Sequence, residues 1–340
     1  MTDPSGEPAE GSDTPSTRAQ ARRAGESSSS FQEHVRAARS EFEHQVASAR
    51  ADFEQVNDRI NARTGRNLLM AILIGVAIGA VVLASLLFVK GLFLVFAIPV
   101  CLLGIFEFTR ALQTAGYRVD LIPQLAAGAV VTLVGYLQGY LTHVVLTFAC
   151  IALVIVWRLI AQMVARDARR YGEVLGDVLV SSFVLLYVPF LASFTLVLLR
   201  QDQGEFWLLG MVLAVVAADT GAYASGLAFG AHPMAPRISP KKTWEGFAGG
   251  ALLTVGVSIA YGIFVLGIPW WAGAVFGVVM LGCATAGDLG ESMIKRDLGI
   301  KDMSSWLPGH GGVLDRLDSI LPSAAAALAM YFLFFPLVTA

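Results

Sequence analysis

The sequence predicts an all-α, polytopic integral membrane protein with about nine transmembrane helices. Of its 340 residues, 56% are hydrophobic and only 15% are charged, and the mean hydropathy is +0.65. The apolar residues form long runs, most of them close to the ~20 residues that a helix needs to cross a bilayer. Lysine and arginine are distributed unevenly among the segments between these runs, which is typical of membrane proteins with a fixed orientation.

The first 65 residues differ from the rest of the chain. Residues 1–30 are rich in Ser, Pro, Gly and Glu, and they contain too little apolar surface to offset the entropy of ordering, so we expect a disordered tail. In residues 31–65, Phe31, Phe42 and Phe53 recur every eleven positions. This pattern predicts a cytoplasmic amphipathic helix that self-associates or lies on a membrane surface. The transmembrane domain then covers residues 66–340.

Nine apolar runs predict nine spans. They cover residues 68–89, 91–110, 119–137, 139–160, 175–199, 205–228, 246–267, 269–293 and 317–338. If the amino terminus is cytoplasmic, only Lys90 and Arg200 of the 24 lysine and arginine residues lie on the outer side. This asymmetry favours an N-in, C-out orientation. Pro189, Pro269 and Pro336 fall within or at the ends of spans, where we expect kinks rather than helix ends.

Charged residues concentrate between Ser292 and Asp318, at the boundary between two apolar runs. Charge is costly to hold at a membrane, so such a cluster predicts a functional site. Helical spacing places Asp288 and Ser292 on one face, and Asp315 near Asp318 on another. Asp219 lies in a third span and shares a helix face with Tyr223, one turn later. The loop after this span opens on the same side of the membrane. Several carboxylates with no nearby cysteine favour Mg²⁺.

Two loops on that side supply positive charge. One loop covers residues 235–246 and contains Lys241 and Lys242, and the other covers residues 295–316. Glycines around His310 allow the backbone to approach a bulky anion closely. A metal, several cations and a glycine-rich turn are typical of phosphoryl-type transfer, here between a lipid phosphate and a soluble nucleotide.

Residues 292–318 have the pattern S-x-I-K-R-x(4)-K-D-x-S-x(2)-L-P-x-H-G-G-V-x-D-R-L-D, which resembles the signature of phosphatidate cytidylyltransferases (CDP-diacylglycerol synthases). Residues 219–223 and 239–246 resemble two further conserved blocks of that family. The resemblance covers about residues 68–340, and the first 65 residues depart from the compact bacterial form. It implies that CTP and phosphatidic acid give CDP-diacylglycerol and pyrophosphate with Mg²⁺. It also implies a cytoplasm-facing site in the inner (plasma) membrane, a K⁺ beside the Mg²⁺, and homodimers.

This reaction suggests a role for each polar residue of the motif. We expect Asp288, Asp315 and Asp318 to hold the metal, with Asp219 as a further ligand or an orienting group. The residues expected to neutralise or bind the phosphates are Ser239, Lys241, Lys242, Ser292, Lys295, Arg296 and Arg316, with His310 as a hydrogen-bond donor. Asp219, Lys295, Asp315 and His310 are the predicted catalytic residues.

Three other classes of protein fit part of the pattern. A secondary transporter also carries intramembrane carboxylates, but it would be expected to spread them through mid-span sites and to show internal repeats. A CDP-alcohol phosphatidyltransferase would carry a different acidic motif, and a membrane scaffold would not explain residues 217–318. We interpret Glu107 as an interfacial residue, and Arg166, Arg169 and Arg170 as determinants of orientation. We expect no nucleic-acid partner.

Overall fold

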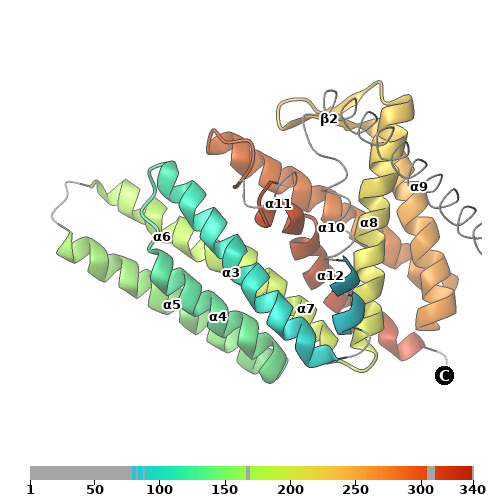
Figure 1. The fold of residues 1–340 in the computed structure, drawn as a ribbon, viewed down its shortest axis with the longest axis horizontal. Coiled ribbons are helices and arrows are strands. Elements are labelled where there is room, and N and C mark those ends of the chain that lie inside the picture. Colours follow the sequence, from blue (N-terminus) through green and yellow to red (C-terminus); the bar gives the residue numbers. More distant parts are fainter. Residues whose placement is uncertain (1–78, 82, 87–88, 166–168, 305–310, 339–340) are drawn as a thin grey trace, which may run out of the picture. The chain divides into compact units, whose positions relative to one another are not determined.

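A computed structural model describes residues 79–338, apart from 82, 87–88, 166–168 and 305–310. The expectations for residues 1–30 and 31–65, and most of the predicted span 68–89, lie outside the described residues. The described elements, in chain order, are α3 (Lys90–Thr114), α4 (Leu121–Leu137), α5 (Tyr140–Val164), α6 (Tyr171–Leu185), the π-helix η1 (Leu186–Phe190), α7 (Leu191–Leu199), α8 (Gly204–Phe229), β1 (Pro233–Ala235), β2 (Ser239–Thr243), α9 (Trp244–Tyr261), the π-helix η2 (Gly262–Leu266), α10 (Trp270–Asp297), α11 (Leu314–Leu317), α12 (Ile320–Phe334) and the 3₁₀ helix η3 (Phe335–Leu337). Figure 1 shows their arrangement.

Seven helical segments among the described residues are long and apolar enough to cross a membrane. Three of them combine neighbouring elements: α6 to α7, α9 with η2, and α11 to η3. The apolar helix α4 is shorter, with 17 residues. Each predicted span from 91–110 onward contains one of these helices, so the all-α, polytopic membrane class is confirmed. Pro189 lies inside η1 without ending its span, as expected, and Pro336 lies inside η3. Pro269 instead lies at a helix boundary, because it is the N-cap of α10, so a kink was wrongly expected there.

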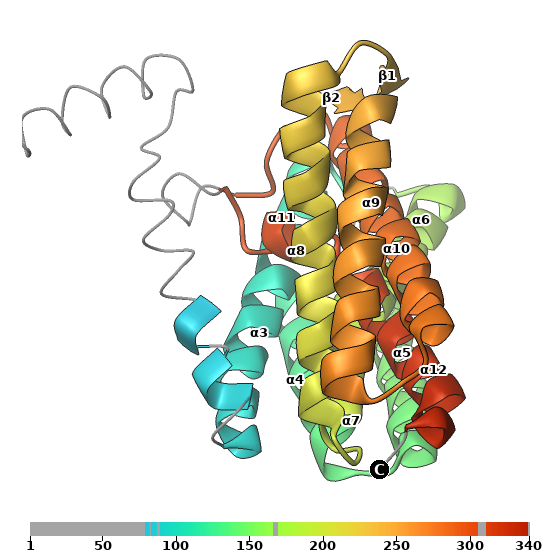
Figure 2. The same ribbon diagram turned by 90° about the vertical axis from the view of Figure 1, so that its right-hand side faces the viewer.

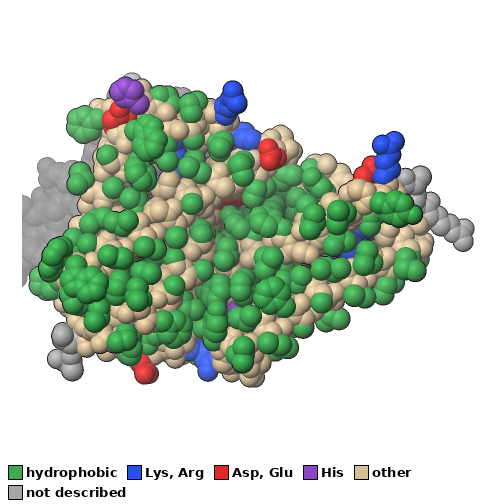
Figure 3. All heavy atoms as spheres, turned by 180° about the vertical axis from the view of Figure 1, so that it is seen from behind, with side chains coloured by type: hydrophobic (Ala, Val, Ile, Leu, Met, Phe, Trp, Pro, Cys, Tyr) green, Lys and Arg blue, Asp and Glu red, His purple; other side chains and the backbone are tan. Residues whose placement is uncertain are grey.

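The outer surface of the helices is apolar. On the face shown in Figure 3, hydrophobic side chains cover most of the body, and most charged side chains lie near its upper and lower edges. Met163 and Phe264 are each 85% exposed, which would be unfavourable in water. Such exposure is expected where lipid surrounds a helix.

Close helix packing fixes the elements that carry the site. Figures 1 and 2 show α8 and α9 side by side, with the β1–β2 hairpin at their upper ends. Glycines allow this approach: a Cβ atom added at Gly250 would lie 2.9 Å from the Ala218 carbonyl oxygen, and one at Gly221 would lie 2.9 Å from the Gly249 carbonyl oxygen. Small residues are the usual means by which membrane helices come this close. Trp207 on α8 is fully buried, and its ring packs against Phe276 of α10 and Tyr331 of α12.

Different polar contacts are found at the two ends of the helices. At one end, Lys90 pairs with Glu205 at 2.6 Å, and Arg200 donates to the Gln138 carbonyl oxygen. These are the two cations predicted to lie apart from the others. At the other end, the Arg296 Nε atom donates to the Ile238 carbonyl oxygen at 3.4 Å, which joins α10 to the hairpin.

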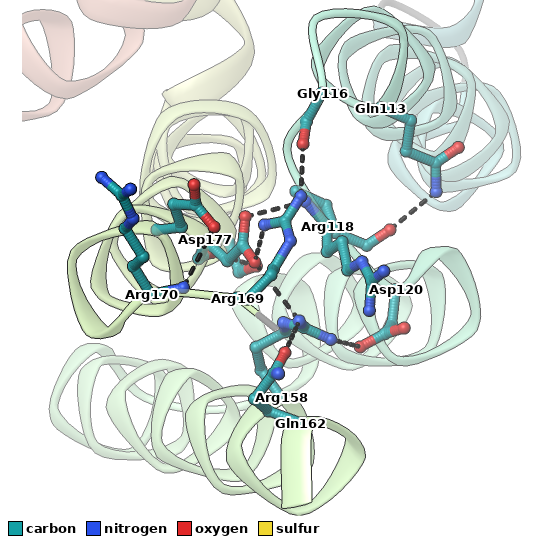
Figure 4. Close-up of polar contacts among 12 residues, drawn as sticks. Gln113, Gly116, Arg118, Asp120, Arg158, Gln162, Arg169, Arg170 and Asp177 are labelled. Atoms are coloured by element: carbon teal, nitrogen blue, oxygen red, sulfur yellow. Dashed lines mark hydrogen bonds and ion pairs between the residues drawn. The ribbon is translucent and has the colours of Figure 1, made fainter. Parts of the chain in front are cut away.

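A buried ionic cluster joins the loop before α4 to α5 and α6 (Figure 4). Its centre is Asp177, which is fully buried on α6. Its Oδ1 accepts from the Arg118 backbone N–H at 2.8 Å, and its Oδ2 accepts from Arg158 at 3.2 Å and from Arg169. Arg169 also donates to the Gly116 carbonyl oxygen at 2.6 Å. Arg169 therefore holds helices together, in addition to any influence on orientation.

Candidate active site

A cavity of about 290 Å³ opens between α8, the β1–β2 hairpin, α9 and α10. Asp219 and Tyr223 from α8, Lys241 and Lys242 from β2, and Asp288 from α10 line it. Asp219 and Tyr223 thus share the face that their spacing predicts. Carboxylates and amines from three separate elements meet in this one cavity, which is the usual form of a small-molecule site.

The hairpin is fixed to the first turn of α9. Thr243 caps this helix, because its Oγ1 accepts from the Gly246 N–H at 3.2 Å. Two residues later, Glu245 accepts from the backbone N–H groups of Ala231 and His232 at 3.1 and 3.2 Å. These bonds hold both ends of the hairpin together. They place Lys242 in an ion pair with Asp288 across the cavity.

Beside the cavity, α10 faces α11 and the start of α12 along two turns. Lys295 Nζ donates to Asp315 Oδ1 at 2.8 Å and to Glu291 Oε2 at 3.4 Å. One turn away, the carboxyl groups of Glu291 and Asp318 lie within electrostatic range of each other. Ser292 donates to Asp288 Oδ1 at 3.4 Å, which confirms their common face. The part of α10 that carries Asp288 and Glu291 is therefore rich in carboxylates, and Lys295 neutralises only part of their charge.

Asp219 belongs to the same electrostatic neighbourhood. It lies within electrostatic range of Asp318 and Asp288, and also of Lys242 and Arg316. Acidic groups from α8, α10 and the α11–α12 segment therefore approach one region, as the sequence predicts. Like charges at such separations are stable only if protons or cations accompany them.

Asp315 organises the loop that precedes it. Besides Lys295, it binds the backbone N–H groups of Met303 at 3.0 Å and Gly312 at 2.8 Å, both through Oδ2. Gly311 has a φ of +82°, which favours glycine. A Cβ atom at Gly312 would lie 2.7 Å from Glu107 Oε2. The glycines that suggested contact with a bulky anion are thus needed where the chain passes against the protein's own carboxylates.

Glu107, on α3, is the second anchor of this loop. Its side chain accepts from the backbone N–H groups of Val313 at 3.0 Å and Leu314 at 2.8 Å, and from Ser304 Oγ. Glu107 is only 2% exposed, so its side chain lies inside the protein and not on its surface. A carboxylate at the start of α11 satisfies N–H groups that would otherwise lack partners. The 207 positions that separate Glu107 from Leu314 explain why no local pattern reveals this contact.

Replacing Glu107 with glutamine is expected to destabilise the protein by about 1–3 kcal/mol, because one buried N–H group or the new amide loses its partner. Thermal unfolding of the detergent-purified variant would measure this loss. Glu173→Gln is the matched control, since Glu173 makes an exposed bond to the Arg170 N–H at a helix start. Equal melting temperatures for the two variants would contradict the anchoring role of Glu107.

The structure brings together most of the predicted site residues, but in two adjoining groups. Asp219, Lys241, Lys242 and Asp288 line the cavity, whereas Lys295 and Asp315 meet where α10 contacts α11. The residues outside the cavity lining are Ser239 on β2, Ser292, Lys295 and Arg296 on α10, Arg316 on α11, Asp315, and Asp318. His310 lies outside the described residues. Glu291 is the member that sequence reasoning missed, although its spacing of three from Asp288 places it on the same helix side.

The carboxylates have the donor chemistry of a divalent-cation site. Glu291 Oε1 is buried and has no hydrogen-bond partner among the described residues, and Asp318 lies within electrostatic range of the Glu291 carboxyl group. Within the described part of the chain, however, no three Asp, Glu, His or Cys side chains converge at metal-binding distances. Lys242 and Lys295 pair with two of the predicted ligands instead. Oxygen donors near uncompensated charge fit Mg²⁺.

Comparison with known proteins matches residues 69–334 to the cytidylyltransferase family. The chain is 41% identical over 271 residues to phosphatidate cytidylyltransferase of Mycobacterium bovis, covering 78% of this chain and 89% of that protein. It is 38% identical over 283 residues to phosphatidate cytidylyltransferase of Mycobacterium leprae, covering 79% and 88%. A shorter match, 44% identical over 140 residues, covers 40% of this chain and 48% of the phosphatidate cytidylyltransferase of Haemophilus influenzae.

The fold and the site define a multi-pass membrane enzyme whose acidic and basic groups meet at one end of its helices. The chain belongs to the cytidylyltransferase family and is a nucleotidyltransferase. The resemblance of residues 292–318 is thereby confirmed, and the transporter, CDP-alcohol phosphatidyltransferase and scaffold alternatives are set aside.

Proposed function

We propose that the protein transfers CMP from CTP to phosphatidate, which forms CDP-diacylglycerol and releases pyrophosphate. The family and the names of its relatives support this reaction. The observation that carries it is the cavity in which Asp219 and Asp288 meet Lys241 and Lys242. A nucleotide can enter from the polar end of such a site, while a lipid approaches from the apolar surface of the helices.

In this reaction, an oxygen of the phosphatidate phosphate attacks the α-phosphorus of CTP. The bond from that phosphorus to the bridging oxygen breaks, and the bond electrons leave with pyrophosphate. The nucleophile is already an anion, so no covalent enzyme intermediate is needed. The task of the protein is to bring two anions together and to neutralise the leaving group. Lys241 and Lys242 are placed to do so in the cavity, with Arg296 and Arg316 nearby.

We assign Mg²⁺ to the carboxylates of the site. Asp288, Asp315 and Asp318 would hold it, with Asp219 as a further ligand or orienting group, and Glu291 beside them. When bound, the ion neutralises charge on the triphosphate and on the departing pyrophosphate. Ser239, Ser292 and His310 are the proposed hydrogen-bond donors to substrate. A K⁺ next to the Mg²⁺ and a homodimer belong to the same proposal and rest on family resemblance.

The proposed orientation is N-in and C-out, with nine spans and a site that faces the cytoplasm from the inner (plasma) membrane. Two contacts support it. Lys90 and Arg200 bind partners at one end of the helices, whereas the hairpin and the loop before α11 lie at the other end. Cytoplasmic loops carry most of the positive charge in membrane proteins, so the lysine-rich hairpin end should be the cytoplasmic one.

Pyrophosphate release by the purified protein tests the proposed function. We expect release from CTP only when phosphatidate and Mg²⁺ are both present, and we expect EDTA to abolish it. Release that does not require phosphatidate, or product formation that continues in excess EDTA, would contradict the reaction or its metal dependence.

Replacing Lys242 with methionine is expected to raise the KM for CTP by about tenfold or more, because a charge-assisted bond to phosphate is worth roughly 1.5–3 kcal/mol. Initial rates at varied CTP and saturating phosphatidate would measure the change. Lys90→Met is the matched control, because Lys90 pairs with Glu205 at the opposite end of the helices. An unchanged KM for CTP in Lys242→Met would remove Lys242 from the nucleotide site.

A further inference from the structure

Tyr187 lies in an interruption of regular helix. It belongs to η1, the π-helical turn that interrupts the span from Tyr171 to Leu199. Single π-turns inside α-helices occur frequently at functional sites. The ring is fixed by aromatic neighbours: it stacks on Phe183 with centroids 5.4 Å apart and meets the edge of Phe108 at 6.0 Å. Its hydroxyl is therefore held in one direction.

That hydroxyl is a buried polar group in the vicinity of the acidic residues. Tyr187 Oη has no hydrogen-bond partner among the described residues. The Tyr187 ring packs against a buried cluster that contains Leu314 of α11, and Ile294 of α10, three residues after Glu291, packs against the same cluster. The carboxyl groups of Glu291, Asp318 and Asp288 lie within electrostatic range of the hydroxyl. Burying a hydroxyl without a partner costs roughly 1–3 kcal/mol, so a bound water or another polar group is expected to satisfy it.

Glu291 presents the complementary atom. Its side chain is completely buried on α10, and Oε2 faces Lys295 at 3.4 Å. Its other oxygen, Oε1, is likewise buried without a hydrogen-bond partner among the described residues. A donor and an acceptor, carried by different helices, are thus both in need of a partner in the same region. A single water that bridges them would satisfy both, since buried waters typically make about three hydrogen bonds.

We propose that Tyr187 is a positioning residue of the active site, whose hydroxyl donates through a bridging water to Glu291 and so fixes the Glu291–Asp318 carboxyl pair. This inference rests on the proposed function, because it assigns Asp318 to the catalytic metal. Tyr187 acts through these carboxyls and contacts no substrate. Residues that orient metal-site carboxylates affect activity by about 10- to 100-fold. The lysines proposed to bind the nucleotide, Lys241 and Lys242, lie on β2, so we expect the KM for CTP to change little.

A double-mutant cycle between Tyr187→Phe and Glu291→Gln tests this contact. Phenylalanine keeps the ring packing and removes only the hydroxyl. We expect Tyr187→Phe to lower kcat by about tenfold while the KM for CTP stays within twofold of wild type. We also expect the double variant to lose little more than the worse single variant, both in kcat and in melting temperature, because residues joined by one network are not additive.

Tyr261→Phe is the matched control, because Tyr261 Oη donates to the Phe206 carbonyl oxygen and belongs to another contact. Its melting-temperature shift should add to that of Glu291→Gln. An unchanged kcat in Tyr187→Phe, or additive shifts in the Tyr187–Glu291 cycle, would overturn the proposal. The melting-temperature cycle needs no turnover. If wild-type protein made no CDP-diacylglycerol, the proposed function would fail, while the cycle would still decide whether Tyr187 and Glu291 are coupled.

Discussion

Asp315→Asn is expected to lower CDP-diacylglycerol formation by about 100- to 1,000-fold, comparable to the loss of an oriented charge-stabilising group in other enzymes. The carboxylate accepts three hydrogen bonds, from Lys295 Nζ and from the N–H groups of Met303 and Gly312. An asparagine side chain has one acceptor oxygen, so its amide nitrogen would face at least one of these donors. The loop before α11 and the ammonium of Lys295 would both lose their fixed positions.

Initial rates of the purified variant would measure this loss, and its presence in the membrane fraction would show that insertion is intact. Asp297→Asn is the matched control, because Asp297 is exposed at the end of α10. We expect that variant to retain activity within twofold of wild type. Activity of Asp315→Asn at the level of Asp297→Asn would remove Asp315 from the site.

Asp177→Ala is expected to destabilise the protein by about 3–5 kcal/mol, because it removes the buried carboxylate that pairs with both Arg158 and Arg169. The side chains of Arg158 and Asp177 are only 4% and 1% exposed. The cluster also holds the Arg118 N–H and Arg169, so several contacts among the loop before α4, α5 and α6 fail together. Unfolding of the detergent-purified protein, followed by circular dichroism, would measure the change.

The pair between Lys90 and Glu205 is more exposed and provides the comparison, with side chains 39% and 22% exposed. Glu205→Ala should cost at most about 1 kcal/mol, because solvent-exposed ion pairs contribute little. Equal unfolding free energies for Asp177→Ala and Glu205→Ala would show that the buried cluster is not a structural link.

Features that depend on neighbouring residues were predictable from the sequence. The apolar runs locate the helices because hydrophobic length is a local property. Helical spacing correctly places Asp219 with Tyr223, and Asp288 with Ser292, on common faces. The segment between the predicted spans 205–228 and 246–267 was expected to be a loop, whereas the structure forms a short hairpin there. Its sequence contains Pro233 and Pro240, and proline argues against strand structure.

Features that depend on distant residues were not predictable. Glu107 anchors a loop far along the chain, and Tyr187 packs against a cluster that includes Leu314, more than 100 positions away. The partner of Asp315 within the motif, Lys295, was expected to bind phosphate, and spacing alone gives no reason for their ion pair. Such contacts follow from how the helices pack together, and local patterns in the sequence do not reveal that packing.

Transfer of the α-phosphate of CTP into lipid tests the central claim most directly. Purified protein would be incubated with phosphatidate, Mg²⁺ and CTP that is radiolabelled at either the α- or the γ-phosphate. We predict that the α-label enters the chloroform-extractable lipid as CDP-diacylglycerol and that the γ-label is released as pyrophosphate. Lipid that carries the γ-label, or no lipid label from either position, would contradict the account.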